Sequence, residues 1–415
     1  MASTSVAVAQ SAPPASTDPH MARARRVLST TPLVDGHNDL PWAIREATAA
    51  PHDVEAYDLR KQTPGHTDLA RLKQGMVGAQ FWSIYIPGEI RDSGYARVQL
   101  EQFDIARRVI AKYPERLQWA LTADAVRSAF RAGKIGSLLG LEGGHAIENS
   151  LGALRVYYDL GARYMTLTHN VTLDWADAAL DSAKHGGLTS FGKEVVHEMN
   201  RLGMLVDLSH VSPGTMSDAL DATEAPVIFS HSGARALVDH PRNVPDSILA
   251  RLPKNGGVVM VPFVTSFVSA EVKAWGDAQS QAAADASRRL GSDTAAVRRA
   301  MDEWTTAHPQ PKATLAQVAD HIDHIRKVAG VDHVGIGSDF DGITDVVVGL
   351  EDVSKFPGLF AELSRRGWSD ADLRKLAGEN ALRALKQAEV VSARLKKERP
   401  PSTKTIQELD GKVAQ

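Results

Sequence analysis

Eight short apolar runs recur along the chain, and longer stretches with helical spacing of apolar residues separate most of them. The runs are rich in Val, Ile, Leu and aromatic residues and do not alternate with polar residues. This pattern is typical of parallel strands that helices cover on both faces. The runs lie at 32–36, 76–85, 135–141, 162–168, 203–209, 225–230, 256–263 and 332–338.

The stretches between these runs predict helices. Residues 97–113, 190–202 and 315–329 place apolar side chains at helical spacing, and Gly203 follows the second stretch as a stop signal. Strands that alternate with helices indicate the α/β class. Eight such strands predict a closed (β/α)8 TIM-like barrel rather than an open sheet.

The chain has 415 residues, which exceeds the roughly 250 residues typical of such a barrel. We therefore expect a single domain with insertions, of which the polar segment 264–314 is the largest. The expected boundaries are a disordered N-terminal tail at 1–21, the barrel at 22–395 and a polar C-terminal tail at 396–415.

The N-terminal segment bears on localisation. Ala7-Val8-Ala9 before Gln10 is similar to the end of a cleavable export signal, but the charged start and apolar core of such a signal are missing. We expect a cytoplasmic protein, with a periplasmic or secreted location as the alternative if an export signal has been trimmed.

Composition excludes several classes of partner and site. Lys plus Arg number 47 and Asp plus Glu 50, so the chain has no electrostatic reason to bind nucleic acid. No apolar stretch is long enough for a membrane span, and no lipid-anchor signal follows, so we expect no membrane anchor. The absence of cysteine excludes thiolate metal sites, disulfides and a cysteine nucleophile. Any metal must be held by His, Asp and Glu.

Six of the eight predicted strands end in His, Asp or Glu. In a parallel barrel these ends meet at one rim, where such enzymes keep their active sites. Gathering so many imidazoles and carboxylates is costly unless a cation organises them. The set consists of His37, Asp39, Glu142, His169, His210, His231 and Asp339.

These donors predict a pair of divalent metal ions. Without thiolates they suit Zn²⁺, with Mn²⁺, Fe²⁺ or Co²⁺ as further possibilities. Glu142 could bridge two ions, and His210 and His231 could complete the second one. Such a pair would hold a bridging hydroxide and clamp a tetrahedral intermediate.

Other motifs give weaker signals. No Gly-x-Ser-x-Gly motif or phosphate-binding loop is present. Arg242 is open to two interpretations, a surface residue of a proline-rich loop or a planar fork that grips a carboxylate. We interpret His145 as a packing residue near the rim. We interpret the following as ordinary surface histidines: His52, His66, His185, His197, His240, His308, His321 and His324.

Several motifs together resemble the membrane (renal) dipeptidase family of metallopeptidases, from about residue 22 to residue 390. Because the chain lacks the disulfides and lipid-anchor signal of the animal members, it is similar to the bacterial branch. The motifs, in family order, are VDGHNDLPW at 34–42, GLEGGH at 140–145, VDLSH at 206–210, FSHS at 229–232, RNVPD at 242–246 and GIGSDFDG at 335–342.

The resemblance implies a (β/α)8 barrel of the metal-dependent hydrolase type, with two zinc ions that Glu142 and a hydroxide bridge. His37 and Asp39 would bind one ion, and His210 and His231 the other. The implied activity is hydrolysis of free dipeptides, L-Xaa-L-Xaa and also L-Xaa-D-Xaa, and the family implies a homodimer.

The resemblance also assigns three residues to the substrate. His169 would contact it and stabilise the developing oxyanion. Arg242 would hold the C-terminal carboxylate of the dipeptide. Asp339 would hold the free amino terminus and shuttle a proton to the leaving amine.

Two alternatives remain at this stage. One is an amidohydrolase of the same barrel class that acts on another small amide, a lactam or an N-acyl amino acid. The other is a barrel that serves as a binding or structural protein, against which the complete ligand set argues.

Overall fold

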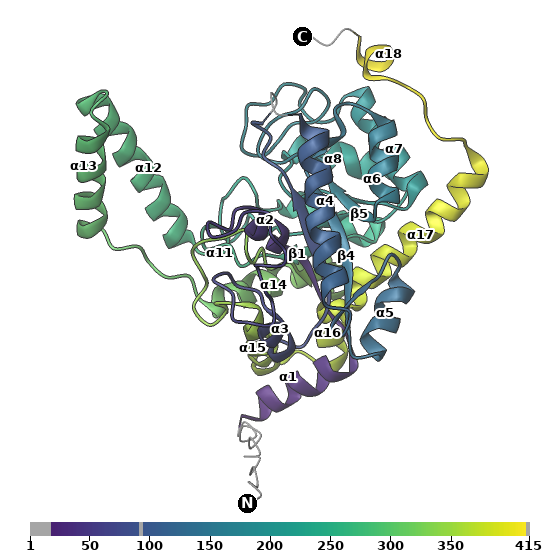
Figure 1. The fold of residues 1–415 in the computed structure, drawn as a ribbon, viewed down its shortest axis with the longest axis horizontal. Coiled ribbons are helices and arrows are strands. Elements are labelled where there is room, and N and C mark those ends of the chain that lie inside the picture. The colour runs from purple at the N-terminus through teal and green to yellow at the C-terminus, as the bar shows by residue number, and fades with distance from the viewer. Residues whose placement is uncertain (1–17, 91–93, 412–415) are drawn as a thin grey trace, which may run out of the picture.

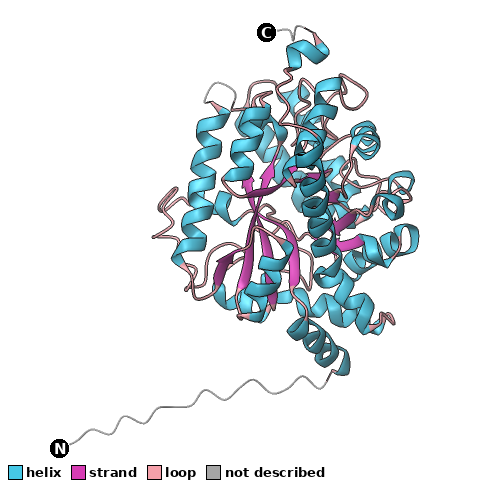
Figure 2. Ribbon diagram, turned by 90° about the vertical axis from the view of Figure 1, so that its right-hand side faces the viewer, coloured by secondary structure: helices cyan, strands magenta, loops and turns pink. Residues whose placement is uncertain are grey.

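The strands form a parallel barrel that helices surround (Figure 2). The computed structural model describes residues 18–90 and 94–411. Eight strands close the ring in the order β1, β2, β4, β5, β6, β7, β8, β9 and back to β1, and every pairing is parallel. The predicted (β/α)8 class is therefore confirmed. The bounds are β1 (Leu33–Asn38), β2 (Val77–Tyr85), β4 (Ile135–Glu142), β5 (Ala162–Thr166), β6 (Leu205–Asp207), β7 (Ile228–Phe229), β8 (Val258–Val261) and β9 (Val334–Ile336).

A further strand, β3 (Leu117–Trp119), pairs with the first half of β4 outside the ring. This strand was not predicted from the sequence, because three residues are too few to show a pattern. The second half of β4 pairs instead with β5, from Leu139 onward.

The helices of the barrel end where local sequence signals place their ends. The predicted helices at 190–202 and 315–329 coincide with α7 (Ser190–Leu202) and α14 (Leu315–Ala329). Gly203 adopts a left-handed φ of 89° that ends α7. The other helices of the ring are α2 (Leu40–Arg45), α3 (Leu69–Gln74), α4 (Tyr95–Lys112), α5 (Ala123–Arg131), α6 (Leu151–Asp159), α8 (Pro213–Ala222), α9 (Asp246–Leu249), α10 (Leu252–Asn255), α15 (Phe356–Arg365), α16 (Asp370–Arg374) and α17 (Asn380–Glu398).

The predicted insertion at 264–314 forms a helical hairpin that projects from the barrel (Figure 1). It begins with the short α11 (Thr265–Val268) and continues as α12 (Ala270–Leu290) and α13 (Thr294–Ala307). Only Val272 and Ala286 are buried on α12, and no residue is buried on α13. Its polar composition therefore reflects a solvated element rather than a second core.

Both ends of the described chain carry structure. Helix α1 (Pro19–Thr30) packs against α15, and residues 1–17 lie outside the described part of the chain. The segment expected as a polar tail contains α18 (Ile406–Asp410), which packs on α7 with Ile406 buried. The carboxylate of Asp410 accepts a hydrogen bond from the Thr189 hydroxyl at 2.6 Å.

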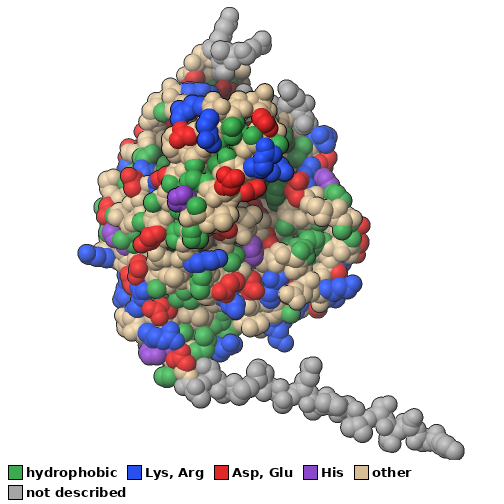
Figure 3. Space-filling model, turned by 90° about the vertical axis from the view of Figure 1, so that its left-hand side faces the viewer, with side chains coloured by type: hydrophobic (Ala, Val, Ile, Leu, Met, Phe, Trp, Pro, Cys, Tyr) green, Lys and Arg blue, Asp and Glu red, His purple; other side chains and the backbone are tan. Residues whose placement is uncertain are grey.

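The surface fits the balanced composition. On the face that Figure 3 turns to the viewer, basic and acidic side chains are interspersed. Within the described residues, no helix combines the length and apolar character that a membrane crossing needs.

The interior of the barrel is packed up to its rim. Tyr164 of β5 is fully buried and occupies the space beside Gly140 of β4, where an added Cβ would lie 2.0 Å from the Tyr164 Cζ. The Tyr164 hydroxyl lies 2.8 Å from Nδ1 of His37. Tyr164 thus connects the packing beside Gly140 to His37, a residue of the predicted site.

We predict that Gly140→Ala lowers the free energy of unfolding by about 1–3 kcal/mol, because the new methyl group must displace Tyr164. Denaturant unfolding measures the effect. Gly276→Ala is the matched control, since no atom lies within 4 Å of its added Cβ on the exposed α12. It should leave stability unchanged or raise it by up to about 1 kcal/mol. Equal stabilities of Gly140→Ala and the parent would contradict the packing argument.

Candidate metal centre

The predicted site residues lie together at the carboxyl ends of the strands. His37 is in β1, Glu142 ends β4, and Asp39 directly follows β1. His169, His210, His231 and Asp339 come two or three residues after β5, β6, β7 and β9. With Arg242, all except His37 line one pocket of about 320 Å³, and the His37 imidazole contacts three of its carboxylates.

Glu142 stands between two groups of donors. Its Oε2 lies 3.3 Å from Nε2 of His37, which is itself 3.2 Å from Oδ2 of Asp39. Its Oε1 lies 3.1 Å from Nε2 of His210 and 3.6 Å from Nε2 of His231. One carboxylate therefore offers an oxygen to each side, which is the arrangement that bridging of two cations requires.

Hydrogen bonds orient the two imidazoles on the Oε1 side. Nδ1 of His210 lies 3.0 Å from Oδ1 of Asn170, an acceptor. Nδ1 of His231 lies 2.8 Å from the hydroxyl of Ser230, which donates its own proton to Asp207 at 2.6 Å. Each Nδ1 must therefore carry the proton, and each Nε2 presents a lone pair to the pocket.

The two Nε2 atoms of His210 and His231 are only 2.9 Å apart. Two lone pairs at this distance repel unless a cation lies beside them. Burial lowers the pKa of both imidazoles well below the usual value, so a proton is a poor candidate for that cation. A divalent metal ion fits the position.

The donors on the Oε2 side of Glu142 also need a cation. Nε2 of His37 and Oδ1 of Asp39 are buried and have no hydrogen-bond partner among the described residues. Nδ1 of His37 faces the Tyr164 hydroxyl, which donates to the carbonyl of Gly36 at 3.2 Å. Nε2 is again free to bind a metal, and a cation would satisfy both orphaned atoms.

Electrostatics agree with a cation site on this side. Burial alone would lower the pKa of His37, but Tyr164, Glu142 and Asp39 raise it well above the usual value. Burial would raise the pKa of Glu142, but His37 and His210 hold it well below the usual value. The centre therefore carries negative charge and attracts positive charge to the position of His37.

Two residues of the site have strained backbones. His210 and Asp339 have φ values of 68° and 67°, in the left-handed region that non-glycine residues rarely adopt. Each costs on the order of 1 kcal/mol or more. Hydrogen bonds hold them there, from Ala179 N to the carbonyl of His210 at 2.7 Å and from Asp339 N to the carbonyl of His37 at 3.1 Å.

Two buried carboxylates support the strand ends. Asp207 of β6 accepts hydrogen bonds from Ser230 N at 2.8 Å and from the Thr166 hydroxyl at 2.6 Å. Asp35 of β1 accepts from the backbone N–H and the hydroxyl of Ser338, both at 2.7 Å. Burial raises the pKa of Asp35 to about 6, although these hydrogen bonds oppose the shift. The sequence analysis assigned these residues no role, although an aspartate within an apolar run was a usable signal.

Arg242 faces the pocket. It is buried, its Nε has no hydrogen-bond partner among the described residues, and the carboxylates of Asp339, Glu142 and Asp207 act on it without a hydrogen bond. Burial lowers its pKa to about 10, so it stays protonated at neutral pH. Of the two interpretations of Arg242, the structure excludes the surface residue.

Asp339 and His169 complete the polar lining. Oδ1 of Asp339 lies 4.0 Å from Nε2 of His37, and burial raises the pKa of Asp339 well above its usual value. Nε2 of His169 lies 3.9 Å from Oε1 of Glu142. Burial lowers the pKa of His169, which favours a neutral imidazole.

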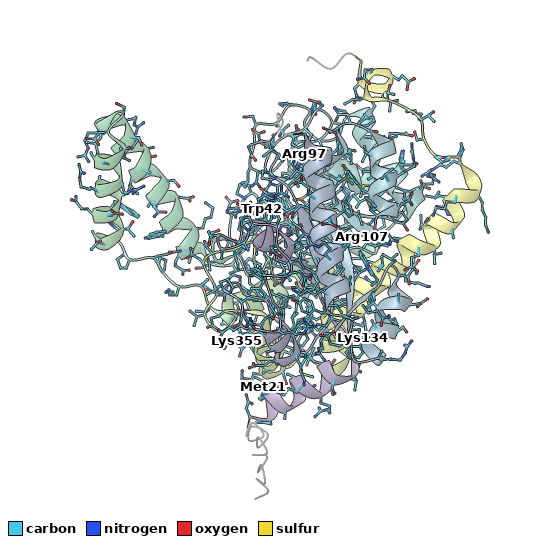
Figure 4. The ribbon with its side chains drawn as sticks, in the orientation of Figure 1. Met21, Trp42, Arg97, Arg107, Lys134 and Lys355 are labelled. Atoms are coloured by element: carbon cyan, nitrogen blue, oxygen red, sulfur yellow. The ribbon has the colours of Figure 1, made fainter. Side chains whose placement is uncertain are left out.

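The pocket wall also includes residues that were not predicted as site residues, namely Trp42, Tyr85, Asn170, Asp341 and Gly342. Tyr85 ends β2, packs edge-on against Trp42 of α2 at 4.9 Å (Trp42 is labelled in Figure 4), and lies tilted against His169 at 4.8 Å. Its position was a usable signal, since the predicted strand 76–85 also ends at the rim.

The interpretation of His321 as a surface residue was wrong. It is fully buried in α14 and accepts a hydrogen bond from Ala234 N at 2.9 Å. The apolar face of a helix can include a histidine when a backbone N–H donates a hydrogen bond to its Nδ1. The sequence does not reveal that hydrogen-bond partner.

A parallel eight-stranded barrel whose rim gathers imidazoles and carboxylates defines a metal-dependent hydrolase. A profile of the membrane dipeptidase family (peptidase family M19) matches residues 21–399. The chain belongs to this family, which confirms the resemblance, and it is a metallo-dipeptidase.

Solved structures agree. The chain is similar to the probable dipeptidase PvdM from Pseudomonas aeruginosa, with 26% identity, a TM-score of 0.78, and coverage of 91% of this chain and 100% of that one. A metallopeptidase from Rhodobacter sphaeroides, liganded with a phosphinate mimic of L-Ala-D-Ala, has 26% identity and a TM-score of 0.70 over 86% of this chain and 99% of that one. Dipeptidase AC, a metallopeptidase, has 27% identity and a TM-score of 0.70 over the same shares.

We predict that Ser230→Ala weakens metal binding by about 10- to 100-fold, because His231 loses the acceptor that fixes its proton on Nδ1. Competition with a chromophoric chelator measures the affinity. Ser280→Ala on the exposed face of α12 is the control and should bind metal as the parent does. Unchanged affinity in Ser230→Ala would contradict the orientation argument.

Proposed function

We propose that the protein is a zinc-dependent dipeptidase that hydrolyses free dipeptides of the types L-Xaa-L-Xaa and L-Xaa-D-Xaa. The observation that carries the proposal is the pocket itself, in which an unpaired buried Arg242 and the carboxylate of Asp339 accompany the donors around Glu142. A free dipeptide has a carboxylate at one end and an ammonium group at the other. The phosphinate mimic of L-Ala-D-Ala in the Rhodobacter sphaeroides relative supports the D-residue.

The donor set supports two zinc positions. His37, Asp39 and Glu142, whose ligand atoms lie within 4.8 Å of one another, would hold one ion. Glu142, His210 and His231 would hold the other, because Oε1 of Glu142 lies 3.1 Å and 3.6 Å from the two imidazoles. A set of imidazoles and carboxylates without thiolate suits zinc. When bound, the ions supply an activated water as nucleophile and stabilise negative charge on the carbonyl oxygen.

The remaining residues bind and orient the substrate. The Arg242 fork accepts the C-terminal carboxylate through two parallel N–H···O bonds. Asp339 holds the amino terminus and passes a proton to the nitrogen of the leaving amine. His169 donates a hydrogen bond to the oxygen of the scissile carbonyl as charge develops on it.

The two end charges would select substrates by length. A carboxylate that lies too far from the scissile bond cannot reach Arg242 while the amine contacts Asp339. Binding energy from both ends then serves the transition state of dipeptides alone. The pocket of about 320 Å³ suits so small a ligand. The homodimer that the family resemblance implies stays a prediction.

The direct test measures amino-acid release from L-Ala-L-Ala, L-Ala-D-Ala and Gly-D-Phe. Each dipeptide is compared with its N-acetylated and C-amidated forms, before and after metal removal and zinc return. We expect release from the free dipeptides only, lost on chelation and restored by zinc. Equal release from the blocked forms would indicate the general amidohydrolase, and no release with metal bound would contradict the proposed substrate.

We predict that Arg242→Gln raises KM for L-Ala-L-Ala by about 30-fold or more, because a buried carboxylate loses its charged partner. Hydrolysis of the amidated dipeptide should change little. Steady-state kinetics on both substrates measure the difference. Arg298→Gln on exposed α13 is the matched control and should behave as the parent does. An equal loss on both substrates would contradict recognition of the carboxylate.

A further inference from the structure

We propose that Phe267 is a positioning residue that holds the Arg242 guanidinium in place for the substrate carboxylate. Phe267 belongs to α11, the first turn of the insertion between β8 and β9. The insertion would thus contribute to substrate recognition through this ring. The inference rests on the proposed function of Arg242 and deepens it.

The first observation is how Arg242 is held. Its Cζ lies 5.1 Å from the centre of the Phe267 ring, within the range of a cation–π interaction. The guanidinium also donates a long hydrogen bond from Nη2 to the carbonyl of His231 at 3.4 Å. Because the carboxylates of Asp339, Glu142 and Asp207 act on Arg242 through their charge and not through a hydrogen bond, the aromatic ring is a direct support for the charged group.

The second observation is that Phe267 is itself fixed from the loop that carries Arg242. Nδ2 of the buried Asn243 donates a hydrogen bond to the Phe267 carbonyl at 2.8 Å. The His240 ring packs on the Phe267 ring at 4.4 Å, and Arg242 N donates to Nδ1 of His240 at 3.1 Å. Loop residues 240–243 and α11 therefore form one unit around the guanidinium.

This arrangement has a chemical consequence. An ion pair within the protein would occupy the N–H groups of Arg242 and compete with the substrate. An aromatic ring contacts the delocalised cation without using its hydrogen-bond donors. The fork is thus held in place while its donors stay available for an incoming carboxylate.

The test compares Phe267→Leu with Phe267→Tyr in steady-state kinetics. We expect Phe267→Leu to raise KM for L-Ala-L-Ala by about 3- to 30-fold, the range of a cation–π contact between exposed and desolvated sites. We expect kcat to change by less than the KM effect. Preference for the free over the amidated dipeptide should fall by a similar factor, and Phe267→Tyr, which keeps the ring, should retain most of it.

A double-mutant cycle separates positioning from general damage. In the Arg242→Gln background, Phe267→Leu should have little further effect on KM if it acts through the guanidinium. Phe103→Leu, which truncates a buried ring of α4 away from the pocket, is the control for cavity formation and should leave KM unchanged. Zinc content and unfolding midpoints are measured for all variants.

Three results would overturn the inference. These are an unchanged KM in Phe267→Leu, an undiminished effect in the Arg242→Gln background, and a loss of kcat and zinc at constant KM. They are distinct from failure of the proposed function. That function fails if the parent protein itself does not discriminate between free and amidated dipeptides.

Discussion

The carboxylate of Glu142, which offers one oxygen to His37 and the other to His210 and His231, is the contact on which the whole site depends. Its neighbours come from separate strands, so the geometry exists only when the barrel is closed. The neutral imidazoles of His210 and His231 point lone pairs at nearly the same position. Such a cluster is costly in a buried pocket unless cations occupy it. Metal ions would therefore stabilise this arrangement of buried side chains at the rim.

The scaffold around this contact is built to hold it. Asp207 and Asp35 bind the backbone of neighbouring strand ends, and Tyr164 connects the floor of the barrel to His37. The left-handed backbone at His210 and Asp339 shows that packing elsewhere compensates for local strain. Rigid support of this kind is what places ligands from distant parts of the sequence within a few tenths of an ångström of their working positions.

Much of the fold and site could be predicted from the sequence, because the relevant signals are local. A residue such as Glu142 or His231 stands directly after an apolar run, and parallel strands bring those positions together. Helices α7 and α14 have clear apolar periodicity and clear caps. The rest depends on tertiary contacts. Strand β3 is too short to show a pattern. The buried His321 accepts a hydrogen bond from the N–H of Ala234, which is far away in the sequence. The contact between Phe267 and Arg242 exists only in the folded chain.

The segments that connect the strands place aromatic side chains beside the residues of the pocket. The insertion at 264–314 places an aromatic ring against Arg242, and the segment after β1 places Trp42 against Tyr85. The proposed metal donors lie in the strands or within three residues of the strand ends. We expect two cations on opposite sides of Glu142. Anomalous diffraction from crystals of the zinc-loaded protein, recorded at the zinc absorption edge, would locate them. We expect two peaks, one beside His37 and Asp39 and one beside His210 and His231, whereas a single peak or peaks elsewhere would show that Glu142 does not bridge two ions.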